Sequence, residues 1–65
     1  MIKFHKNEFV YLQSIAYGQK FTYSCKMQIT NIRPESDHPY RCKTKDGNVS
    51  FFKESDLRIC LDSSF

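Results

Sequence analysis

The segment Tyr40–Lys45 alternates strictly between apolar or β-branched residues and basic residues. A period of two is the pattern of a strand that has one buried face and one exposed face. The turn residues Asp46–Asn48 follow, in which Gly47 can adopt a positive φ, and Val49–Lys53 then resumes an extended, aromatic-rich pattern. The sequence therefore predicts a β-hairpin in this region. Its inward side chains on the first strand are Tyr40, Cys42 and Thr44.

Two segments before the hairpin are also predicted to be strands. Phe9–Gln13 is short and apolar, and Cys25–Thr30 alternates with a period of two. Ile32 falls on the opposite parity, so a β-bulge near Asn31 is needed to return its side chain to the core. The inward residues of these two strands are predicted to be Val10, Leu12, Cys25, Met27 and Ile29.

The other segments are predicted to connect or close this sheet. Arg33–Pro39 is polar and contains two prolines, which indicates a mobile surface loop. Ser14–Tyr23 has three aromatic residues without a sustained period and is interpreted as a long aromatic loop. Glu54–Leu57 suits a single helical turn, and Arg58–Leu61 suits a closing strand. Residues 62–65 are predicted to be a frayed tail.

The order of these elements, together with several motifs, resembles small barrels of the SH3-like group. This group includes KOW-type and Tudor-like modules and several tiny phage-encoded proteins. The resemblance covers about residues 9–61 and implies an all-β, five-stranded SH3-like barrel with one helical turn before the last strand. It also implies a phage or mobile-element origin. The matching residues are Phe4 or Phe9 with Val10, then Lys26, Ile29, Ile32, Tyr40, Cys42, Asp46, Gly47, Phe51, Phe52, Glu54, Asp56 and Leu57.

The chain departs from two ligand-binding patterns of these barrels. Proline-rich peptide recognition is not expected, because the chain has no A-L-Y-D-Y segment and no Trp. Methyl-lysine recognition needs an aromatic cage, and no spacing in the sequence identifies one. Tyr17, Phe21, Tyr23 and Tyr40 are the rings that such a cage would use.

The length of the chain favours binding over catalysis. A chain of 65 residues is predicted to form one domain, residues 1–65, with little stability to spare for groups held in strained positions. The longest apolar run is Phe9–Leu12, far short of the roughly 20 residues that span a bilayer, and no signal-peptide core precedes it. We therefore expect a cytoplasmic, non-enzymatic protein with no small-molecule substrate and no membrane partner.

The three cysteines do not form a recognisable metal or disulfide pattern. They are spaced too far apart for a zinc site with His5 or His38, and their number is odd. We interpret Cys25 and Cys42 as small buried hydrophobic residues and expect no metal and no cofactor. Cys60 lies on the face opposite Ile59 and Leu61 and is predicted to be the most reactive thiol.

The first functional hypothesis is a protein-interaction module. Ten aromatic residues exceed what a small barrel can bury, so several rings are predicted to be exposed as interface anchors. The alternative is that loop aromatics fold back to close the end of the barrel. By its resemblance to phage-encoded barrels, such a module is expected to be a small inhibitor or adaptor of a larger host protein. The predicted protein-binding residues are Tyr17, Phe21, Tyr23, Tyr11 and Phe52.

The second functional hypothesis is a nucleic-acid-binding barrel. The chain has ten Lys and Arg against seven Asp and Glu, a net charge of +3, which permits an anionic partner. Basic residues on the outward face of one strand and its neighbour could contact a phosphate backbone, with stacking from Tyr17 or Tyr23. The alternative is a solvated face that protects the sheet from edge pairing. The predicted nucleic-acid-binding residues are Lys26, Arg33, Arg41, Lys43 and Lys45.

Overall fold

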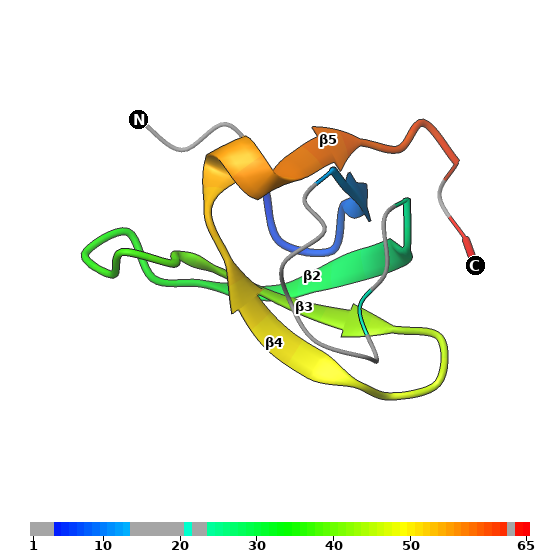
Figure 1. The fold of residues 1–65 in the computed structure, drawn as a ribbon, viewed down its shortest axis with the longest axis horizontal. Helices are drawn as coiled ribbons and strands as arrows, with labels where there is room; N and C mark the ends of the chain where they lie inside the picture. Colours follow the sequence, from blue (N-terminus) through cyan, green and yellow to red (C-terminus); the bar gives the residue numbers. More distant parts are fainter. Residues whose placement is uncertain (1–3, 14–20, 22–23, 63) are drawn as a thin grey trace.

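The described residues form a single antiparallel sheet that curls around one hydrophobic core (Figure 1). The structure is a computed structural model, and it describes residues 4–13, 21, 24–62 and 64–65. The strand order is β4-β3-β2-β1-β5, so the first strand pairs with the last. The elements are β1 (Phe9–Leu12), β2 (Lys26–Ile32), β3 (Tyr40–Thr44), β4 (Val49–Phe52), the 3-10 helix η1 (Glu54–Asp56) and β5 (Leu57–Ile59).

The prediction of an all-β fold with five strands and one helical turn before the last strand is confirmed. The predicted hairpin is β3 and β4, closed by hydrogen bonds from Thr44 N–H to Asn48 O (2.9 Å) and from Gly47 N–H to Thr44 O (3.0 Å). Gly47 has a φ of 91°, a left-handed conformation that glycine adopts without strain. The hairpin therefore has the turn that the sequence predicted. Membership of the SH3-like group stays a prediction.

The alternating side chains divide the sheet into an inner face and an outer face. Tyr40, Cys42 and Thr44 are buried, as predicted, and so are Val10 and Leu12 from β1. Ring contacts extend the core to residues that lie outside the strands. The ring of Phe4, which lies outside the strands, meets that of Tyr40 edge to face at 5.4 Å. The core residues are Phe4, Val10, Leu12, Phe21, Met27, Ile29, Tyr40, Cys42, Phe52 and Leu57.

A β-bulge in β2 returns Ile32 to the core, as predicted. Ile29 pairs with Cys42 and Asn31 pairs with Arg41, so Thr30 is the extra residue. The Thr30 hydroxyl donates to Arg41 O (3.1 Å) and accepts from Arg41 Nη1 (2.8 Å). Ile32 is half-buried against the core. Without the bulge, its side chain would lie on the outer face.

The loop between β2 and β3 and the helical turn before β5 lie where the sequence predicted them. Residues 33–37 are exposed, and a hydrogen bond from Arg33 N–H to Pro39 O (2.7 Å) closes the loop between β2 and β3. The mobility predicted for this loop stays a prediction. In η1, Asp56 Oδ2 accepts from Lys53 N–H (3.1 Å), which fixes the helical turn just before the buried side chain of Leu57.

The last strand and the residues after it differ from the prediction. The final strand begins at Leu57, which pairs with Leu12, and ends at Ile59. Leu12 and Leu57 form an inner-face pair, so the strand starts one residue earlier than its apolar pattern suggested. Phe65, which we predicted to lie in a frayed tail, packs its ring edge to face on Phe9 at 4.9 Å.

Candidate functional site

The charged residues of the strands share one sign and one face. Among the described strand residues there are four charged side chains, all basic, and none is Asp or Glu. The register pairs Arg41 with Asn31, Lys43 with Gln28, and Tyr11 with both Lys26 and Arg58. These positions alternate with the core residues, so the charges lie on the outer face. The four basic residues are Lys26, Arg41, Lys43 and Arg58.

Aromatic rings lie between these cations. Across β3 and β4, Phe51 is directly opposite Arg41 and is 39% exposed. The guanidinium carbon of Arg33 lies 5.9 Å from the centroid of the Phe51 ring, and that of Arg58 lies 5.0 Å from the centroid of the Tyr11 ring. These distances are within the range of cation–π attraction. The outer face thus combines positive charge with accessible rings.

The structure brings the predicted basic residues to this part of the molecule. Lys26, Arg41 and Lys43 lie on the outer face of β2 and β3. Arg33 is exposed directly after β2, and Lys45 is exposed directly after β3. We call the outer basic face the set of cations Lys26, Arg33, Arg41, Lys43, Lys45 and Arg58, with the rings of Tyr11 and Phe51.

The aromatic residues predicted to bind a protein partner do not form one exposed surface among the described residues. Phe52 is 0% exposed and Phe21 is 7% exposed, and their rings meet edge to face at 5.5 Å within the core. The prediction that these two rings are exposed is therefore wrong. Phe52 pairs with the inward-facing Tyr40, so alternation places Phe51 on the outer face instead. The burial of Phe21 agrees with the alternative that a loop aromatic folds back onto the core.

The other three members of that predicted interface are placed only in part. Tyr11 is half-buried on the outer face. Tyr17 and Tyr23 lie outside the described residues. Phe51 and Arg58 were not predicted from the sequence as site residues, although the alternation through Phe51 and Phe52 requires that one of the two rings faces outward.

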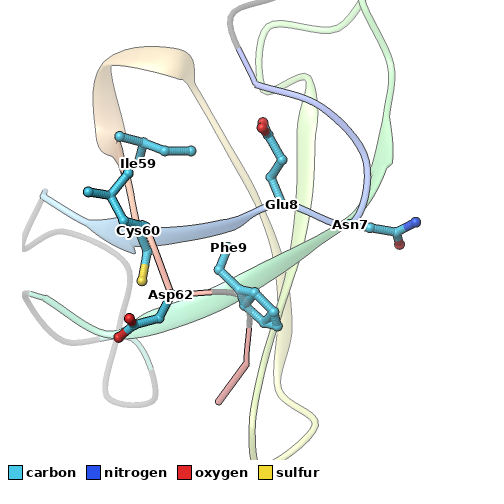
Figure 2. A pocket seen from close by; sticks show the side chains of 7 residues that line it. Asn7, Glu8, Phe9, Ile59, Cys60 and Asp62 are labelled. Atoms are coloured by element: carbon cyan, nitrogen blue, oxygen red, sulfur yellow. The ribbon is translucent and has the colours of Figure 1, made fainter.

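Two shallow grooves lie on either side of the segment that follows β5. One has a volume of 330 Å³ and runs along Asn7, Glu8 and Phe9; Figure 2 shows Phe9, Cys60 and Asp62 around it. The other has a volume of 550 Å³ and is lined by Tyr11, Ser24 and Arg58. Ile59 and Leu61 border both grooves and are 43% and 94% exposed. This edge therefore presents two exposed aliphatic side chains beside concave surface.

Of the two cysteines predicted to be buried, Cys42 is buried and Cys25 is half-buried. Cys60, which we predicted to be the most reactive thiol, lies opposite Phe9 on the outer face and is only 6% exposed. This burial argues against high reactivity. A hydrogen bond between the side chains of Tyr11 and Cys60 raises the pKa of Tyr11. Burial raises the pKa of the Cys42 thiol to about 12, which keeps it protonated and non-nucleophilic. Cys25 is half-buried against the core and is the most accessible of the three.

Within the described part of the chain, no group of three or more His, Cys, Asp or Glu side chains is arranged to hold a metal ion. His5, one of the two histidines, lies 3.6 Å from the Glu8 carboxylate through its Nδ1 atom. No helix among the described residues is long and apolar enough to cross a membrane.

Comparison with known proteins provides no relative for this chain. No family model matches the sequence, and no curated protein or solved structure matches it. Any functional conclusion therefore depends on the geometry described above.

Proposed function

We propose that this protein is a non-enzymatic binding module whose outer basic face binds single-stranded nucleic acid. The observation that carries the proposal is the separation of charge: every charged residue in the described strands is basic and lies on the outer face. The described acidic residues lie in turns, loops and η1. A surface of this kind attracts a polyanion over its whole width.

The rings on this face favour single strands over duplexes. Unpaired bases stack on aromatic side chains, and proteins that bind single strands combine such rings with a basic surface. Phe51 is accessible, lies opposite Arg41 and is flanked by Arg33. A base stacked on Phe51 would place the neighbouring phosphates within reach of these two guanidinium groups.

A solvated face that prevents edge pairing explains the basic residues but not the accessible ring. Charged side chains keep a sheet from pairing with other chains, whereas an exposed apolar ring promotes such association. Val49, 38% exposed, lies opposite Lys43 and adds to the apolar surface beside the cations. The combination of ring and charge is therefore the feature to test.

The test is the salt dependence of binding to a labelled single-stranded DNA or RNA of about 12 nucleotides, followed by fluorescence anisotropy. If four cations neutralise phosphates, log K should fall with log[salt] with a slope of about −3, at about 0.7 per phosphate. The double variant Arg41→Ala/Lys43→Ala should weaken binding to every sequence and reduce that slope by about 1.4.

A matched pair of charge removals controls for net charge. Lys6→Ala/Lys53→Ala removes the same charge from exposed positions outside the outer basic face. Because Lys53 follows β4 at the parity of Phe51, the strict control is Lys6→Ala alone, compared with Lys43→Ala alone. Lys6→Ala should leave the slope nearly unchanged. Phe51→Ala should reduce affinity by about 1–3 kcal/mol at constant charge. No binding at low salt, or equal losses in both charge variants, would overturn the proposal.

A second candidate function is a protein interaction through the apolar edge after β5. Leu61 is almost fully exposed and, with Ile59, borders both grooves, so the two side chains could be buried together against a partner. The expectation of a small inhibitor or adaptor of a host protein belongs to this candidate. Capture of a protein partner from lysate that survives nuclease treatment and is lost in Leu61→Ser would support it. Capture that is retained in Leu61→Ser would remove this edge as the interface.

A further inference from the structure

One aromatic ring on the outer face is hidden from solvent. Phe9 pairs with Gln28 on the outer face and does not belong to the core cluster, yet it is only 7% exposed. The ring of Phe65 packs on it edge to face, with centroids 4.9 Å apart and an interplanar angle of 89°. A residue from the end of the sequence therefore covers an aromatic position of the sheet.

The neighbouring cation is covered by the same part of the chain. Lys26 Nζ lies 3.7 Å from Asp62 Oδ2 and donates a hydrogen bond to the backbone carbonyl of Ser64. The same ammonium lies 5.5 Å from the centroid of the Phe9 ring. Among the described residues of the outer basic face, Lys26 is the cation that forms an ion pair with a carboxylate. We call Asp62, Ser64 and Phe65 the C-terminal cover.

We propose that the C-terminal cover is an intramolecular competitor of nucleic acid on the outer basic face. A nucleotide offers an anion and a flat ring, and Asp62 and Phe65 supply the same two groups to Lys26 and Phe9. A strand that uses these two residues must first displace the cover. The inference rests on the proposed function and adds its regulation.

The contacts of the cover are weak enough to be displaced. The Asp62 side chain is 78% exposed, and ion pairs in water contribute little to stability. A single ring–ring contact adds a modest amount. Together these contacts correspond to a closed form favoured about three- to tenfold. Because a competing closed form lowers apparent affinity by that factor, opening it should raise affinity by about the same amount.

The test uses the 65-residue chain and the labelled single-stranded oligonucleotide described above. Phe65→Ala removes the covering ring without changing charge and should tighten binding about threefold or more. Asp62→Asn frees Lys26 but also raises the net charge, so Glu54→Gln, an exposed acid in η1, serves as the matched control. Asp62→Asn should exceed this control by about threefold. In NMR spectra, the Phe9–Phe65 contact should disappear when oligonucleotide is added.

The outcomes separate the inference from the function on which it rests. If wild-type protein binds, Phe65→Ala binds no more tightly than wild type, and Asp62→Asn binds no more tightly than Glu54→Gln, the cover does not compete and the inference is wrong. A Phe9–Phe65 contact that persists at saturation leads to the same conclusion. If no variant binds nucleic acid at low salt, the proposed function fails and the inference fails with it.

Discussion

The paired phenylalanines of β4 allow the division between inner and outer faces to be tested at adjacent positions. Phe52 is 0% exposed and packs against Phe21, whereas Phe51 is 39% exposed and faces the opposite side. Replacing a fully buried Phe by Ala costs about 3–5 kcal/mol. A domain of 65 residues has a total stability of about 3–10 kcal/mol. Phe52→Ala should therefore remove about a third or more of the free energy of unfolding, and Phe51→Ala only about 1 kcal/mol.

Urea unfolding followed by circular dichroism or tyrosine fluorescence measures this difference, since the chain has no Trp. Phe52→Leu keeps most of the side-chain volume and provides a variant that stays folded, with a loss of about 1 kcal/mol. A double-mutant cycle between Phe21 and Phe52, with Leu at both positions, should give a coupling energy of about 0.5–1.5 kcal/mol from the ring contact. Equal losses in Phe51→Ala and Phe52→Ala would refute the assignment of the two faces.

Two further predictions concern the cysteines. The Cys42 thiol has a folded-state pKa of about 12 against an ordinary value of 9.0, so the unfolded chain loses this proton first as the pH rises. Stability from this group should be constant below pH 9 and should fall above it by about 1.4 kcal/mol per pH unit, and the difference from Cys42→Ala in urea unfolding should reveal this slope. A difference that stays constant up to pH 11 would contradict it. Native protein treated with a chromogenic disulfide reagent should show one fast thiol, which is lost in Cys25→Ser and kept in Cys60→Ser. Loss of the fast phase in Cys60→Ser instead would show that Cys60 is accessible.

The strands could be predicted because the residues that alternate along the sequence are the ones that the folded core buries. In β3 the inward positions Tyr40, Cys42 and Thr44 are all buried, and the parity of Ile32 was sufficient to locate the bulge. At Phe51 and Phe52 the pattern required one inward and one outward ring, but the choice depends on pairing with Tyr40.

Long-range contacts account for what the sequence did not predict. Phe4 reaches the core through Tyr40, 36 positions away in the chain, by a ring contact and a hydrogen bond from Phe4 N–H to Tyr40 Oη. Cys60 has the parity that we expected, but its exposure depends on neighbours from other segments. Lys26, Arg41 and Lys43 could be assigned to the outer face because the face of a strand residue follows from local alternation. The place of Arg58 depends on the register of β1 with β5, and the cover depends on the contact of Phe65 with Phe9.

The extra residue in β2 ties the two surfaces of the sheet to one another. Thr30 sets the offset that turns Ile32 inward, and its hydroxyl also holds the guanidinium of Arg41. Deleting Thr30 would turn the inward side chains of the rest of β2 outward and the outward ones inward. It would also remove the hydroxyl that holds the Arg41 guanidinium. In related sequences that keep both the hydrophobic core and the outer basic face, we therefore expect no insertion or deletion at position 30. Substitution of Thr30 by Ser, which retains the hydroxyl, is expected to be tolerated.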